Sequence, residues 1–249
     1  MKILVCIKQI NESGDINLFD AHALEEAIRL KQGFDDQEKR DFFSVDVVTV
    51  GPLETSEIIK RAFGMGADTG YHIVTNDHGY VFSFETASKL AVVAKMETYD
   101  LILTGIMSQD LMAGETGPML AEIIGFPCVT SVVKTDLASS SYSIEVEQEM
   151  ENGFLNCLSI KLPAVLTIQA GINTPRYPTL SRMLAAGKKE IITLNQEDLF
   201  PGEDEPVRAR ETLISMEYPD KTRSGYVLEG SLRDKAGELL SILQEKDLA

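Results

Sequence analysis

Apolar runs and stretches of helical periodicity alternate along the first two thirds of the chain. The runs are short, continuous and rich in Val, Ile and Leu, which is typical of strands buried on both faces of a parallel sheet. The predicted strands are Lys2–Lys8, Ser44–Val50, 70–74, 99–105 and 128–133. The predicted helices are 20–31, 52–64, 84–95 and 116–124. Asp20 is the expected N-cap of the first helix. This order predicts an α/β fold with a doubly wound, mostly parallel sheet.

The pattern changes near residue 140. Ser141–Glu149 alternates polar and apolar residues, Asn152-Gly153 is a hairpin signal, and Phe154–Lys161 returns, so an antiparallel pair is expected. A further buried strand is predicted at 162–169, and a proline-containing loop with a short helix follows it.

The last part of the chain has no alternating pattern. Residues 195–220 are acidic and irregular, and an amphipathic helix is expected at about Gly230–Lys246. An isolated helix needs a surface that covers its apolar face, which either its own domain or a partner subunit could supply. We therefore divide the chain into an α/β domain at 1–194 and a C-terminal arm at 195–249.

Composition narrows the function classes. The formal net charge of −16 argues against nucleic-acid binding, which needs a basic surface. No apolar stretch approaches the roughly 18–20 residues that span a bilayer, so no direct membrane insertion is expected, and the amino end is expected to be a strand rather than a signal peptide. Cys6, Cys128 and Cys157 lie far apart. Cys6 and Cys128 are expected to be buried apolar residues, which fits a cytoplasmic protein.

The loop after Gly105 is the strongest candidate for a ligand site. Ligands of a doubly wound sheet lie beyond the carboxyl ends of the strands, near a reversal of strand order. Gly105, Gly114 and Gly117 permit close backbone approach, and the amides near Thr116 and Gly117 open a helix that favours a phosphate. A solvated loop would show the same spacing, and Glu115 would repel a phosphate unless it points away.

An enzyme constellation is hard to assemble from the sequence. The glycine spacing matches neither a dinucleotide fingerprint nor a Walker A loop. His22, His72 and His78 are scattered, none lies in a nucleophile motif, and no metal spacing occurs. His22 is expected to be exposed or partly buried, and His78 to lie in a polar loop.

A collinear series of segments resembles the β subunit of electron transfer flavoproteins over nearly the whole chain. The segments are MKILVCIKQI, NLFDAHALEEAIRLK, VTVGP, RAFGMGAD, DLILTG with the loop that follows it, KLPAVLTI and NTPRYPTLSRMLAAGKKEI. Leu18 stands where the family usually has proline. The last segment is the most specific, because it places Pro175, Arg176, Tyr177, Leu180 and Met183 together as in the family signature.

The resemblance implies an electron carrier subunit without a catalytic site of its own. In the family the α subunit holds a redox-active FAD, and the β subunit clamps it and carries a second adenine nucleotide, usually AMP. The heterodimer takes electrons from dehydrogenases, such as the acyl-CoA dehydrogenases of fatty acid β-oxidation, and passes them to a membrane quinone oxidoreductase or another acceptor. The family's sheet is adenine-nucleotide α-hydrolase-like, and its C-terminal arm wraps the partner. Domain 1–194 would then bind the nucleotide.

The resemblance also assigns the nucleotide contacts. They are Cys6, Asn17, Phe19, Asp20, Val50, Gly51, Asp110, Gly114, Thr116 and Gly117. Leu111–Gly114 replace polar or acidic positions of the family, and Glu115 replaces a common glutamine. In some branches the second ligand is another FAD, used with NADH for electron bifurcation. Their Asp-Gly-Asp-Thr-Ala-Gln-Val-Gly run is absent here, so AMP is the expected ligand and bifurcation the alternative.

Docking to the dehydrogenase is expected from Leu180, with Arg176, Tyr177 and Met183. In the family, the leucine at this position inserts into an apolar pocket on acyl-CoA dehydrogenases, and we expect Met183 and Leu184 to pack beneath the helix. The alternative is that Leu180 is an ordinary core residue.

Two other classes share such a sheet. An adenylating or pyrophosphatase enzyme would have a Ser-Gly-Gly-type phosphate loop after the first strand, which is missing here. A nucleotide-binding module like the universal stress proteins would lack the 173–183 segment and the long arm.

Overall fold

The computed structural model of the protein describes residues 1–10, 13–33, 43–76, 80–137, 143–200, 209–217, 225 and 227–246. The chain forms two compact units, 1–211 and 212–249. The polar loop expected around His78 and the start of the strand expected from Ser141 lie outside the described residues.

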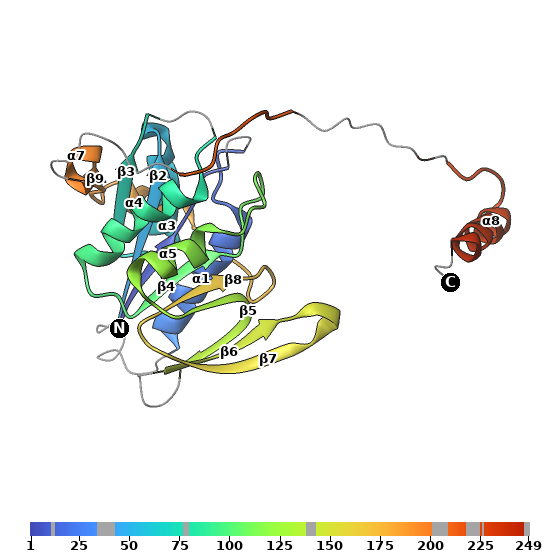
Figure 1. Ribbon diagram of the computed structural model, residues 1–249, viewed down its shortest axis with the longest axis horizontal. Coiled ribbons are helices and arrows are strands. Elements are labelled where there is room, and N and C mark those ends of the chain that lie inside the picture. Colours follow the sequence, from blue (N-terminus) through green and yellow to red (C-terminus); the bar gives the residue numbers. More distant parts are fainter. Residues whose placement is uncertain are drawn as a thin grey trace. The chain divides into compact units, whose positions relative to one another are not determined.

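A single sheet organises the larger unit. Within the described residues its strands stand in the order β7-β6-β5-β8-β4-β1-β2-β3-β9 (Figure 1). All neighbours are parallel except β5–β6 and β6–β7, which are antiparallel. The bounds are β1 Lys2–Cys6, β2 Ser44–Gly51, β3 Thr69–Val74, β4 Leu101–Gly105, β5 Cys128–Leu137, β6 Ser143–Glu149, β7 Leu155–Lys161, β8 Ala164–Ile168 and β9 Ile192–Leu194. The expected doubly wound, mostly parallel sheet is confirmed.

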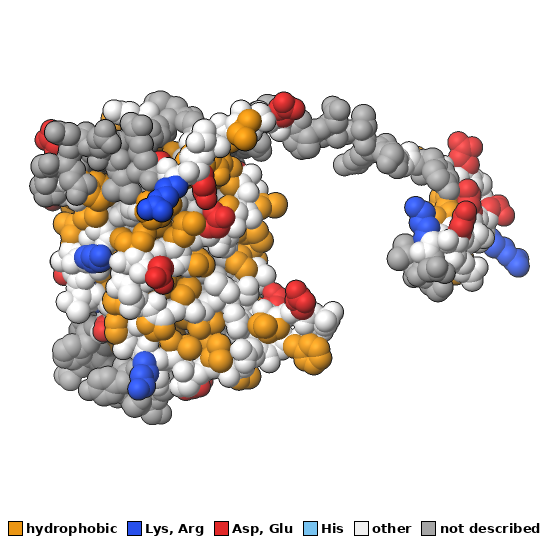
Figure 2. All heavy atoms as spheres, viewed as in Figure 1, with side chains coloured by type: hydrophobic (Ala, Val, Ile, Leu, Met, Phe, Trp, Pro, Cys, Tyr) orange, Lys and Arg blue, Asp and Glu red, His pale blue; other side chains and the backbone are white. Residues whose placement is uncertain are grey.

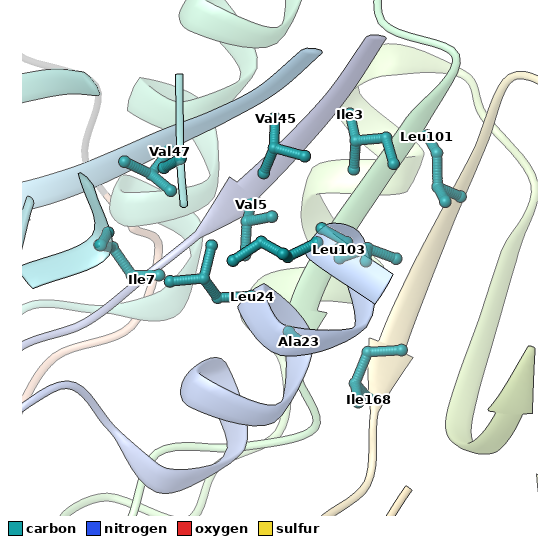
Figure 3. Close-up of a cluster of buried hydrophobic side chains, with 14 of the residues drawn as sticks. Ile3, Val5, Ile7, Ala23, Leu24, Val45, Val47, Leu101, Leu103 and Ile168 are labelled. Atoms are coloured by element: carbon teal, nitrogen blue, oxygen red, sulfur yellow. The ribbon is translucent and has the colours of Figure 1, made fainter. Parts of the chain in front are cut away.

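Helices cover both faces of this sheet (Figure 1). They are α1 Leu18–Gln32, α3 Ser56–Met65, α4 Ser83–Met96, α5 Thr116–Ile124, α6 Leu180–Ala186 and α7 Gln196–Leu199, with short 3-10 turns at Leu53–Thr55 and Glu151–Gly153. Because successive side chains of a strand point to opposite faces, Ile3 and Val5 join the core under α1 and α3, whereas Leu4 and Cys6 join the core under α4 and α5. Figure 3 shows the first of these cores. Each fully buried Val, Leu or Ile contributes about 1.5–3 kcal/mol, which explains why the strands are apolar without alternation.

The antiparallel hairpin is also confirmed. β6 and β7 pair over their whole length, and Asn152 and Gly153 in the turn have φ of 60° and 75°. Both angles are left-handed, which Asn and Gly adopt readily. Hydrophobic side chains lie at the outer end of the hairpin (Figure 2), where Met150, Phe154 and Leu155 are exposed.

The start of α1 differs from the expectation. The helix begins at Leu18, so Asn17 is the N-cap residue and Asp20 lies inside the first turn. Asp20 is buried, and its carboxylate turns away from the helix to accept hydrogen bonds from Lys8 and Gly105. His22, expected to be exposed or partly buried, is buried against Asn173. Cys6 is buried as expected, and Cys128 is partly exposed.

The smaller unit contains α8, Leu232–Glu245. Ser231 caps this helix in a capping box with Asp234, which defines its first turn. No side chain of α8 is buried, and its leucines at 232, 239 and 240 are exposed. None of the helices in the described parts of the chain is both long enough and apolar enough to cross a membrane.

Candidate functional site

The strand order reverses between β1 and β4. After β1 the chain builds β2 and β3 on one side, and then returns to place β4 on the other side of β1 (Figure 1). The loops that follow β1, β2 and β4 therefore meet at one edge of the sheet, where doubly wound folds bind their ligands. We call this region, formed by the carboxyl ends of β1, β2 and β4 and the loops that follow them, the switch edge. The loop after Gly105, selected from the sequence, lies here.

Asp20 ties the two central strands together at the switch edge. Its Oδ2 accepts a hydrogen bond from the Lys8 amide at 2.7 Å, and its Oδ1 accepts one from the Gly105 amide at 2.9 Å. Burial raises the pKa of this carboxyl to about 7, and the backbone hydrogen bonds only partly oppose the rise. The side chain therefore shapes the edge by linking the ends of β1 and β4.

Asn17 holds the loop after β4 in place through both polar atoms of its side chain. Its Nδ2 donates to the Met107 carbonyl at 2.9 Å, and its Oδ1 accepts from the Gln109 amide at 3.0 Å. The Gln109 side chain returns the contact by accepting from the Leu18 amide at 3.0 Å. Since Asn17 is fully buried, this pair of contacts fixes the loop to the start of α1.

Lys8 and Asp110 form an ion pair across the edge. The Lys8 Nζ lies 2.8 Å from the Asp110 Oδ1 and 3.4 Å from the Ser108 Oγ. Partial burial acts to raise the pKa of Asp110, but the hydrogen bonds from Lys8 and Ser108 outweigh it and hold the pKa below its usual value. Beyond this pair the loop is apolar and exposed at Leu111 and Met112, and Met112 has a left-handed φ of 53°.

The start of α5 faces the same edge. Its first amides, at Thr116 and Gly117, have no intrahelical partner by the geometry of a helix. Glu115 occupies the N-cap position but makes no capping hydrogen bond through its side chain, which is exposed.

The glycines of the loop serve protein packing. A Cβ on Gly105 would lie 2.4 Å from the Asp20 Oδ1, and one on Gly117 would lie 2.7 Å from the Thr104 Oγ1. Gly114 has a left-handed φ of 69°. Close approach of α1 to β4, and of α5 to β4 and β8, therefore accounts for Gly105 and Gly117.

The other positions assigned to the nucleotide lie along the same edge. Cys6 ends β1, Val50 and Gly51 end β2, and the Phe19 Cβ lies 2.6 Å from where a Cβ on Gly105 would be. Burial raises the pKa of the Cys6 thiol. The structure thus brings all the assigned positions to the switch edge.

Two residues of the switch edge were missed by the sequence reasoning. Lys8 supplies the cation of the switch edge. Gln109 makes a second hydrogen bond between the loop after β4 and the start of α1. Lys8 carried a usable signal, because a lysine directly after a buried strand must lie at the carboxyl edge of the sheet. Gln109 carried none, since its partner is the distant Leu18 amide.

The segment predicted to dock a partner lies on α6 and the loop before it. Leu180 is 77% exposed and Tyr177 is 82% exposed, so Leu180 is not a core residue. Met183 is partly buried, and its Sδ lies 2.7 Å from where a Cβ on Gly64 of α3 would be. Leu184, expected beneath the helix, is 66% exposed instead because it lies on the outer side with Leu180. The Arg176 guanidinium is bound to Glu25 rather than open to solvent.

Comparison with known proteins identifies the family of the chain. A family model described as "Electron transfer flavoprotein domain" matches residues 5–199. The chain belongs to the electron transfer flavoprotein family. It is 30% identical over 249 residues to a protein of Bacillus subtilis named electron transfer flavoprotein subunit beta, covering 98% of this chain and 93% of the relative. Proteins of the same name from Methylophilus methylotrophus and Bos taurus are 28% and 34% identical, over 98% and 86% of this chain and 98% and 80% of the relatives.

The electron transfer flavoprotein model matches most of the larger unit of the chain. Residues 5–199 contain the whole switch edge and all of α6, and stop before α8. The alignment with the Bacillus subtilis relative covers nearly the whole chain. The resemblance drawn from the sequence segments is therefore confirmed.

Proposed function

We propose that this chain is the β subunit of a heterodimeric electron transfer flavoprotein. In this proposal the α subunit holds the redox-active FAD, and the β subunit presents the complex to dehydrogenases such as acyl-CoA dehydrogenases. Electrons then pass to a membrane quinone oxidoreductase or another acceptor, and this chain has no catalytic site of its own. This electron transfer is expected to take place in the cytoplasm.

The exposed side chain of Leu180 carries this proposal. A large apolar residue on a short, supported helix suits an anchor that enters a partner's pocket, and the small contact area allows fast release. Tyr177 and Leu184 extend the same exposed surface, whereas Met183 faces inward.

Replacement of the anchor tests the docking role. Leu180→Ala in the purified heterodimer should leave folding and flavin content unchanged. Electron transfer from a reduced acyl-CoA dehydrogenase should slow by about tenfold or more, because roughly 1.5–3 kcal/mol of apolar contact is lost. Leu155→Ala, which removes an exposed leucine of β7, is the control and should transfer electrons normally. A Leu180→Ala heterodimer that melts at a lower temperature but transfers electrons at the normal rate would refute the anchor role.

We further propose AMP as the ligand of the switch edge. The amides of Thr116 and Gly117 would hold its phosphate, since a helix start favours an anion. The residues present fit this role: Glu115 leaves the helix start uncapped, and Lys8 supplies a cation whose charge Asp110 partly balances. Asn17 and Asp20 would act by fixing the walls of the site.

Nucleotide release separates AMP from the alternatives. Acid extraction of the purified heterodimer, followed by chromatography, should yield one FAD and one AMP. Two FAD molecules would instead indicate a bifurcating subunit that takes electrons from NADH. One FAD without AMP would show that the altered loop holds no second nucleotide.

The C-terminal arm, 195–249, is proposed to pack on the α subunit. Support comes from α8, whose leucines at 232, 239 and 240 are exposed within its own unit. Domain 1–194 would then be the nucleotide-binding part of the chain.

A further inference from the structure

The loop before α6 is attached to the middle of α1 by two buried carboxylates. Asn173 donates through its Nδ2 to the Glu26 Oε2 at 2.8 Å and to the His22 carbonyl at 3.0 Å. The Asn173 Oδ1 lies 3.0 Å from the His22 Nδ1. Glu26 is held from its other side by the Thr135 hydroxyl at 2.8 Å.

Arg176 makes the stronger attachment. Its Nε donates to the Glu25 Oε2 and its Nη2 to the Glu25 Oε1, both at 2.8 Å, and its backbone amide donates to the Oε2 at 3.1 Å. This two-pronged geometry fixes the orientation of both side chains as well as their distance. Glu25 is only 5% exposed, so water screens the pair weakly.

The far side of the docking segment is supported by α3. Pro178 and Met183 lie directly against Gly64, where a side chain would collide with both. Ala186, at the end of α6, is buried. With these supports, Leu180 is left facing outward.

Alone, α6 could not hold this orientation. It spans only Leu180–Ala186, and helices this short are not stable in water without tertiary contacts. The position of Leu180 must therefore come from the contacts that precede and underlie the helix, and the ion pair of Arg176 with Glu25 of α1 is one of them.

We propose that Glu25 and Arg176 are positioning residues for docking: their ion pair holds the 177–184 surface in the conformation in which Leu180 enters the partner's pocket. This inference rests on the docking function proposed above. Arg176 acts from behind the surface, since its guanidinium is occupied by Glu25 and by the Gln32 side chain at 3.0 Å.

The test uses the heterodimer with Arg176→Gln, Leu180→Ala and the combination of both. In Arg176→Gln, amide hydrogen exchange across 180–186 should accelerate about tenfold or more. The heterodimer concentration that half-saturates an acyl-CoA dehydrogenase, reduced by its acyl-CoA, should rise about tenfold, with the saturated rate within twofold of the original. If Arg176 acts through Leu180, adding Arg176→Gln to Leu180→Ala should change docking by less than twofold, because coupled residues are not additive.

Lys134→Gln provides the control. It breaks an ion pair between β5 and β6, to Glu147 at 2.6 Å, and neither residue belongs to α1 or to the docking segment. It should leave both the exchange of 180–186 and the half-saturating concentration unchanged. Because Arg176→Gln leaves the buried Glu25 without a partner, and this can prevent folding, Glu25→Gln/Arg176→Gln repeats the test without an unpaired charge.

The outcomes separate the inference from the function on which it rests. If Leu180→Ala weakens docking but neither the Arg176 variant nor the neutral pair changes exchange or half-saturation, the positioning role is wrong and the docking role stands. If Leu180→Ala leaves docking unchanged, the docking role fails, and the positioning role fails with it. Full additivity in the combined variant would also overturn the positioning role, because Arg176 would then act independently of Leu180.

Discussion

Gly105→Ala offers a direct test of the packing at the switch edge. The added Cβ would lie 2.4 Å from the Asp20 Oδ1, 2.6 Å from the Phe19 Cβ and 2.8 Å from the Phe19 carbonyl carbon. One of these contacts is backbone, and Asp20 is held on its other side by the Lys8 amide. The start of α1 and the end of β4 must therefore separate to accept the methyl group.

The added methyl group lowers the free energy of unfolding through overpacking and a weakened hydrogen bond, and raises it through backbone entropy. Overpacking a well-packed core costs about 1–3 kcal/mol, and weakening a hydrogen bond to a carboxylate costs about 1.5–3 kcal/mol. Lower backbone entropy of the unfolded chain returns up to about 1 kcal/mol. A net loss of about 3 kcal/mol should lower the Tm by about 10 °C, since each kcal/mol corresponds to roughly 2–4 °C in a chain of this size.

The assay is thermal unfolding of the co-expressed heterodimer by circular dichroism at fixed protein concentration. Gly33→Ala is the matched control, because Gly33 follows α1 with a helical φ of −65° and its added Cβ would come no closer than 3.4 Å to another atom. That variant should melt within a few degrees of the original protein. If Gly105→Ala also melts there, α1 and β4 are not packed as closely as we describe.

Three further predictions concern titration, the arm and the nucleotide. Asp20 keeps its proton to about pH 7 when folded, against an ordinary pKa of 3.8, so the folded state binds more protons between these values and its stability falls as the pH rises through them. The free energy of unfolding relative to Asp20→Asn, measured with urea, should decrease over this range, and a difference independent of pH would contradict the buried carboxyl. The chain expressed alone should aggregate or lose residues beyond about 195 to protease, because each leucine that α8 leaves uncovered forfeits about 1.5–3 kcal/mol; a monodisperse, protease-resistant monomer would disprove the arm's need for a partner. Gly117→Ala should push α5 away from Thr104 and lower the AMP released per heterodimer, and unchanged AMP would remove Gly117 from the site.

The sequence predicts the elements of this fold well because their signals are local. Continuous apolar strands follow from burial on two faces, and the Asn152-Gly153 turn follows from backbone conformations that few other residues adopt. The order of the strands is not local, since β1 acquires β2 and β4 as neighbours through pairings with distant residues. β9 was not predicted as a strand at all, because only its pairing with β3 defines so short an element.

At the switch edge, too, local sequence signals predict some features and contacts with distant residues determine the others. Its location could be predicted, because carboxyl ends of parallel strands meet at one edge. The role of Asp20 could not, since an aspartate near a helix start is typical of an N-cap and only the arrival of β4 gives its carboxylate another partner. Likewise, the sequence placed Arg176 on a docking surface, whereas the buried Glu25 draws its guanidinium inward.

The central position of β1 has a consequence for how the chain is made. Ile3 pairs with Val45 and with Leu101, and β4 in turn pairs with β8. A chain that emerges from the ribosome amino end first therefore exposes one side of β1 until β4 appears, and then one side of β4 until β8 appears. At about 5–20 residues per second, the stretch from Gly105 to Ala164 takes roughly 3–12 s to synthesise. Throughout that time an apolar strand with unpaired backbone groups is open to other chains. Chaperone capacity and slow translation, more than the stability of the finished sheet, should then set the yield of folded protein.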